Sequence, residues 1–177
     1  MSEYGVVTEP GTVRMERLLP GSIERVWAYL TESEKRAKWL AGGDMEMRVG
    51  GRVELKFLHA NLSAEKTPPE RYKKMAGGHT SQGRVTRCDP PRVLGITWGD
   101  GAAESEVVFE LSEQGKDVLL VLTHRRLASR ADMVGVSGGW HAHLGILTDV
   151  LEGVAPRPFW TTHAQVAAEY ETRFAQE

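Results

Sequence analysis

Two periods of hydrophobic residues divide this chain into a strand-rich first part and a helical end. Apolar and polar side chains alternate over 13–19, 53–57, 94–98 and 107–111, which predicts strands with one buried face. The run 118–124 is apolar on both faces, as is typical of a strand covered from two sides. Tight-turn residues separate these runs, so the pattern predicts an antiparallel meander.

Helical spacing first appears directly after the first strand. Ser22 is placed to cap a helix over 23–30, and Ser33 is placed to cap a second, shorter helix that reaches Leu40. The alternation over 45–49 then predicts a strand that pairs with 53–57 around a Gly-Gly turn.

The last third of the chain changes to a helical period. From Ser129 onward the pattern predicts a long helix that ends at Gly153. The spacing of Thr162 and Gln165 fits a capping box for one more helix. The inward stripe of the long helix consists of Trp140, Leu144, Leu147 and Leu151.

Composition and charge exclude several classes of function. The 177 residues suit a single domain, and a net charge of −2 shows no electrostatic footprint for nucleic acid. No stretch approaches the roughly 20 apolar residues of a membrane span, and the acidic N-terminus does not fit a secretory signal. The single cysteine, Cys88, is consistent with a reducing compartment, so the expected location is cytoplasmic.

Several short sequence motifs then suggest a family. Over residues 12–153 the chain resembles the activator of heat-shock-protein-90 ATPase homologue family, a branch of the START-like superfamily. The motifs that carry this resemblance, in order, are Arg17–Trp27, Lys38-Trp39, Val49–Gly51, Gly83–Val85, Asp89–Leu94, Thr97-Trp98, Leu122–His124, Gly139-Trp140 and Leu147–Gly153.

The resemblance implies an α+β helix-grip fold, in which a curved antiparallel sheet wraps around the long C-terminal helix and leaves a cavity. Residues 1–177 are then one START-like domain, with 154–177 as a helical extension. The chain departs from the family at the polar insertion 60–79 and at the tail 158–177, and either segment is placed to reshape the mouth of the cavity. Because one fold hosts many functions, the resemblance implies a ligand-binding cavity and no particular reaction.

Arg17 and His124 are the strongest candidates for polar contact with a ligand, and each has two interpretations. Arg17 falls on the apolar face of its strand, where it either anchors a ligand carboxylate or phosphate or forms an internal ion pair. His124 ends an apolar strand, where it either contacts a ligand and moves a proton or ties the strand to a neighbour.

A metal centre is not expected. His141 and His143 are two residues apart on a helix, so they project in opposite directions and cannot share one ion. His143 flanks the inward stripe, whereas His141 faces away from it. No sequence motif for a cofactor or a nucleophile is present.

The sequence therefore predicts a non-catalytic protein that binds a small apolar or amphipathic molecule. One alternative is an enzyme of the cyclase or dehydratase kind that uses His124 in the same cavity. Another is an interaction module with a filled interior, which forms a homodimer or contacts a chaperone. The expected ligand-binding residues are Arg17, Trp39, Met47, Phe57, Trp98, Phe109, His124, Trp140, His143 and Leu144.

Overall fold

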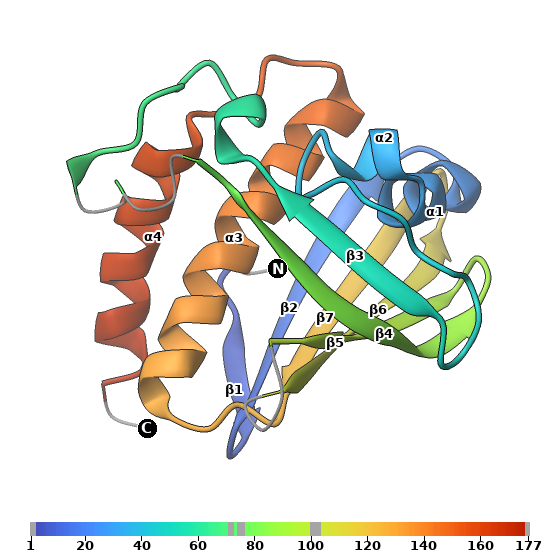
Figure 1. Cartoon of the computed structure of the whole chain (residues 1–177), viewed down its shortest axis with the longest axis horizontal. Helices are drawn as coiled ribbons and strands as arrows, with labels where there is room; N and C mark the ends of the chain where they lie inside the picture. Colours follow the sequence, from blue (N-terminus) through green and yellow to red (C-terminus); the bar gives the residue numbers. More distant parts are fainter. Residues whose placement is uncertain (1–2, 71–72, 74–76, 100–103, 176–177) are drawn as a thin grey trace.

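The computed structural model describes residues 3–70, 73, 77–99 and 104–175. Seven strands form one antiparallel sheet in the order β1-β2-β7-β6-β5-β4-β3 (Figure 1). The strands are β1 (Val6–Glu9), β2 (Thr12–Pro20), β3 (Arg52–Phe57), β4 (His79–Asp89), β5 (Val93–Trp98), β6 (Ser105–Gln114) and β7 (Asp117–Arg125). The helices are α1 (Ile23–Thr31), α2 (Ser33–Arg36), the 3-10 turn η1 (His59–Asn61), α3 (Arg130–Glu152) and α4 (Phe159–Arg173).

The sheet curves around α3, and α4 lies alongside that helix (Figure 1). This arrangement confirms the predicted α+β helix-grip fold. The inward faces of β2 and β7 pack on the stripe of α3 that carries Trp140 and Leu144, and all of these side chains are buried. No helix in the described part of the chain is long and apolar enough to cross a bilayer.

The local signals at three helix ends are confirmed. The Ser22 hydroxyl accepts a hydrogen bond from the Arg25 amide at 3.2 Å, and the Ser129 hydroxyl accepts one from the Asp132 amide at 3.1 Å. Gly153 ends α3 in the left-handed region with φ 75°, which a glycine adopts without the usual steric cost.

The predicted strand over 45–49 is wrong. This segment makes only isolated bridges, Gly42 to Lys56 and Met45 to Val53. Gly43 has φ 109°, and a Cβ there would lie 2.1 Å from the Glu54 carbonyl oxygen. Residues 47–50 instead form bends and a turn, in which the Arg48 amide donates to the Glu46 carbonyl and the Gly51 amide to the Arg48 carbonyl, both at 2.8 Å.

The predicted start of the last helix is also wrong, because α4 begins at Phe159 and not after Thr162. Its first amides are capped from a distant segment. The Ser63 hydroxyl accepts from the Phe159 amide at 3.1 Å, and the Glu65 carboxylate accepts from the Thr161 amide at 2.9 Å. The 60–79 insertion thus stabilises the N-terminus of α4, although its residues 71–72 and 74–76 lie outside the described residues.

The prediction that Ser33 caps a second helix reaching Leu40 is wrong at both ends, because α2 includes Ser33, with Glu32 at its N-cap, and ends at Arg36. The guanidinium of Arg36 is buried and donates to the backbone carbonyls of four residues, Leu30, Thr31, Ala41 and Gly43. Burial lowers the pKa of Arg36 to about 10, so the side chain stays charged at neutral pH. One cation therefore holds the end of α1 against the segment that leads to β3.

We expect Arg36→Met to lower the free energy of unfolding by about 3 to 5 kcal/mol, because several buried carbonyls lose a charged donor at once. Lys35→Met, at the neighbouring half-exposed position, is the matched control and should cost less than about 1 kcal/mol. Urea denaturation measures both. Equal stabilities of the two variants would contradict the role given to Arg36.

Candidate ligand-binding cavity

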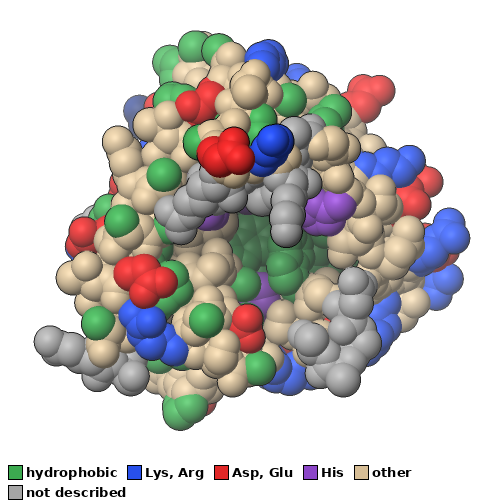
Figure 2. Space-filling view, turned by 60° about the vertical axis from the view of Figure 1, so that its left-hand side comes forward, with side chains coloured by type: hydrophobic (Ala, Val, Ile, Leu, Met, Phe, Trp, Pro, Cys, Tyr) green, Lys and Arg blue, Asp and Glu red, His purple; other side chains and the backbone are tan. Residues whose placement is uncertain are grey.

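A cavity of about 280 Å³ opens between the sheet and the helices α3 and α4. Figure 2 shows this face as a hollow with hydrophobic side chains on its floor and histidine side chains at its edge. The wall consists mainly of aromatic rings and imidazoles: Phe57, His59, His79, Trp98, Gly135, Val136, Gly139, Trp140, His143, Phe159, Trp160 and His163.

The sheet side of the cavity follows from strand register. Phe57 at the end of β3 pairs with His79 at the start of β4, and their rings stack with centroids 4.7 Å apart. These ends of β3 and β4 reach toward α4 (Figure 1). The η1 turn then places His59 between Phe57 and Phe159, at centroid distances of 5.9 and 4.8 Å.

The helix side of the cavity is open because α3 carries glycine there. A Cβ added at Gly135 or Gly139 would meet no other atom within 4 Å. Gly138, between them, instead faces α4, where its Cβ would lie 3.7 Å from the Ala167 side chain. The glycines that weaken α3 as an isolated helix thus create the free volume.

The imidazoles at the centre of the cavity are neutral at pH 7. His143 donates from Nδ1 to the Trp39 carbonyl oxygen at 2.8 Å, and burial lowers its pKa to about 3. Burial likewise lowers the pKa of His59 to about 4, with a smaller contribution from His79 and His163. The wall therefore offers hydrogen-bonding atoms without a strong positive field.

His59 has an unsatisfied polar atom. The ring is 3% exposed, and its Nδ1 has no hydrogen-bond partner among the residues that the structure describes. A buried polar atom without a partner costs free energy, so a ligand group that reaches this nitrogen gains a hydrogen bond.

His124 lies behind the cavity wall and belongs to a closed hydrogen-bond chain. The Trp140 indole donates to His124 Nδ1 at 3.0 Å, so the imidazole proton is on Nε2 and donates to the Ser105 hydroxyl at 2.7 Å. That hydroxyl in turn donates to the Trp98 carbonyl oxygen at 3.0 Å. Both ring nitrogens of this fully buried histidine are used, and burial lowers its pKa to about 4.

The structure brings four of the ten expected site residues to the cavity: Phe57, Trp98, Trp140 and His143. Three others pack in the core around them, namely Trp39, Phe109 and Leu144, and His124 lies in the hydrogen-bond chain. Met47 is 38% exposed and Arg17 lies between β2 and the helices, so neither lines the cavity.

The sequence reasoning expected the insertion and the tail at the mouth of the cavity but named none of their residues. His79 is the last residue of the insertion and His59 directly precedes it, whereas Phe159, Trp160 and His163 come from α4. The available signal was the concentration of aromatic and histidine residues at 57–59 and 159–163. Despite these histidines, the described residues form no group of three His, Cys, Asp or Glu side chains that could hold a metal ion.

Comparison with protein families matches residues 20–152 to the family described as Activator of Hsp90 ATPase homolog 1-like protein. No curated protein matches this chain. Among solved structures, the chain is similar to the solution NMR structure of the protein encoded by gene BPP1335 from Bordetella parapertussis. The two are 53% identical with a TM-score of 0.84, and the match covers 97% of this chain and 91% of that one.

Two more distant structures share the fold. The crystal structure of CalU16 from Micromonospora echinospora is 24% identical, with a TM-score of 0.68 and coverage of 93% of this chain and 86% of that one. The conserved protein of unknown function EF2215 from Enterococcus faecalis is 21% identical, with a TM-score of 0.69 and coverage of 94% and 87%.

The hydrogen-bond chain of His124 generates a prediction about pH. A histidine whose pKa is about 4 when folded and about 6.5 when unfolded takes up a proton on unfolding between these values. Its contribution to stability is therefore complete above pH 6.5 and is lost as the pH falls toward 4, at about 1.4 kcal/mol per pH unit.

His124→Asn keeps an acceptor for Trp140 but cannot titrate. We expect this variant to take up about one proton fewer on unfolding, so its free energy of unfolding should depend less steeply on pH. Urea denaturation at intervals from pH 7.5 to 4.5 measures the slope for both proteins. A slope equal to that of the unaltered chain would show that His124 does not remain neutral in the folded state.

Proposed function

Since this chain belongs to the family of Activator of Hsp90 ATPase homolog 1-like proteins, we propose that it binds a small aromatic molecule in the cavity between the sheet, α3 and α4. The observation that supports this most directly is the open space over Gly135 and Gly139, which is walled by rings on the other sides. A volume of about 280 Å³ suits a compound of two fused rings or a similar size.

The wall chemistry defines the ligand further. Burial of apolar surface, at roughly 25 cal/mol per Å², supplies most of the binding free energy against phenylalanine and tryptophan rings. The neutral imidazoles of His59 and His143 attract no anion. His59 Nδ1 is buried without a partner, and a small rotation of the ring would present it to the ligand for one hydrogen bond. The ligand is therefore uncharged and carries one hydroxyl or carbonyl group.

The two alternative functions have less support. A cyclase or dehydratase that uses His124 needs a ring nitrogen within reach of the substrate, whereas both nitrogens of His124 are bonded behind the wall. An interaction module with a filled interior does not fit the cavity. Self-association, a chaperone contact and a cytoplasmic location stay predictions from the sequence.

Gly139→Leu is the sharpest test of the cavity. The added side chain enters open space, and replacement of a helix glycine stabilises α3 by up to about 1 kcal/mol, so the variant should fold with an equal or higher melting temperature. It should nevertheless lose binding of 2-naphthol, followed by calorimetry and by quenching of tryptophan fluorescence.

Gly138→Ala is the matched control, because it changes the neighbouring residue of the same helix on the side of α4. This variant should bind 2-naphthol as the unaltered chain does. Unchanged binding in Gly139→Leu, or no binding by the unaltered chain of 2-naphthol and other uncharged bicyclic compounds, would disprove the proposal.

His59→Phe tests the polar contact separately from the apolar one. The substitution keeps an aromatic ring but removes Nδ1, so affinity for 2-naphthol should fall about five- to tenfold, as expected for one hydrogen bond. Affinity for naphthalene, which has no hydroxyl group, should not fall. Parallel losses for both compounds would show that His59 acts only through shape.

A further inference from the structure

Arg17 forms a second polar feature outside the cavity. It lies on the inner face of β2, and the residue is 6% exposed. Its guanidinium makes one hydrogen bond within the described chain, from a terminal nitrogen to the carbonyl oxygen of neighbouring Glu16 at 2.7 Å. Arg17 takes part in none of the ion pairs that the described residues form. The other guanidinium nitrogens are not among the fully buried polar atoms that lack a partner, so they keep some contact with solvent and can be reached by a small ligand.

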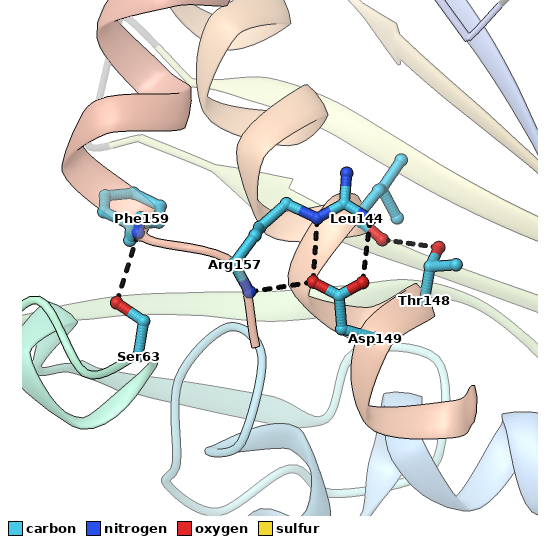
Figure 3. A network of polar contacts seen from close by, with 6 residues as sticks. All are labelled: Ser63, Leu144, Thr148, Asp149, Arg157 and Phe159. Atoms are coloured by element: carbon cyan, nitrogen blue, oxygen red, sulfur yellow. Dashed lines mark hydrogen bonds and ion pairs between the residues drawn. The ribbon is translucent and has the colours of Figure 1, made fainter. Parts of the chain in front are cut away.

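The second arginine nearby is already paired. Arg157 forms a two-pronged ion pair with Asp149, in which both hydrogen bonds are 2.8 Å long (Figure 3). The Arg157 backbone amide donates to the same carboxylate at 2.9 Å. This side chain lies over Gly145, where an added Cβ would be 3.0 Å from it. Asp149 is therefore saturated by Arg157 and does not compensate Arg17.

Aromatic and neutral polar groups complete the surroundings of Arg17. His141 Nδ1 and the Tyr170 hydroxyl are hydrogen-bonded at 2.9 Å, and this hydroxyl accepts from the Gly5 amide at 2.8 Å. Burial, followed by the charges of Arg17 and Arg157, lowers the pKa of His141 to about 4. The imidazole is thus neutral at pH 7 and adds no counter-charge.

The N-terminal segment covers this region. The Tyr4 ring packs on His141 and Tyr170 at centroid distances of 4.7 and 5.4 Å, and the Arg173 guanidinium lies 4.0 Å from the Tyr4 ring centre. The exposed Glu3 is the acid whose charge favours the ionised form of Arg17, although the two form no ion pair. The carboxylate with the largest electrostatic effect on Arg17 therefore belongs to the N-terminal segment.

We propose that the Arg17 guanidinium is the centre of a binding site for a small oxoanion, a phosphate or a carboxylate, beneath the segment 3–5. A planar guanidinium fork binds two oxygens of such a group, and the buried setting strengthens that contact. Glu3 acts as a weak internal competitor for the same cation. This site is separate from the aromatic cavity and does not depend on its function.

Thermal unfolding in inorganic phosphate tests the proposal, with sodium chloride at equal ionic strength as the reference. The melting temperature of the unaltered chain should rise with phosphate concentration, because ligands of the folded state stabilise it. Arg17→Met should abolish this rise. Arg14→Met, on the same strand but with a half-exposed side chain, is the matched control and should keep it. Sodium acetate in place of phosphate separates a carboxylate site from a phosphate site.

Arg17→Met should also fold well, since the side chain it replaces forms no ion pair within the described chain and only one hydrogen bond, to a neighbouring carbonyl. If that variant does not fold, Arg17→Lys keeps the charge but loses the fork and should weaken the phosphate effect at least threefold. Glu3→Gln should strengthen the effect at least twofold. No response to either anion, or an equal response in Arg17→Met, would overturn the proposal. Gly139→Leu should keep the phosphate response, so failure of the cavity proposal would not remove it.

Discussion

The hydrogen bond from the Trp140 indole to His124 is the contact on which the arrangement of the cavity depends. It joins the middle of α3 to β7, and the Ser105 hydroxyl extends it to β6 and to the end of β5. Because each donor in this chain has one acceptor, the order of the bonds sets both the tautomer of His124 and the rotation of Trp140. The helix is thereby held at a defined distance from the sheet, and the space beside Trp140 stays open.

The glycines of α3 face two different sides of the helix within five residues. Gly138 faces α4, where an added Cβ would make an ordinary van der Waals contact with Ala167 at 3.7 Å. Gly135 and Gly139 point to the other side, where nothing fills the volume that a side chain would take. The lower helix propensity of this stretch is offset by tertiary contacts, because α3 is enclosed by the sheet and by α4.

The two faces of α3 also differ in electrostatic character. His143 faces aromatic rings and a backbone carbonyl, whereas His141 faces Tyr170 and the arginines that surround the N-terminal segment. Burial keeps both rings neutral. The two sites proposed above therefore lie on opposite faces of one helix.

The local pattern of residues was sufficient for the fold and for part of the site. Alternation and helical spacing identified β2, β5, β6, β7 and α3, because in these elements the buried face is also the hydrophobic face. The same phase placed Phe57, Trp98, Trp140 and His143 on the inner side.

Contacts between distant segments were decided only by the tertiary structure. Ser63 and Glu65 set the start of α4, and a turn at 47–50 replaces the strand predicted over 45–49. His59 reaches the cavity from a short turn without a hydrophobic period, and His163 from a helix whose position beside α3 no local pattern specifies. A hydrophobic period in sequence reports the burial of an element but not which distant element covers it.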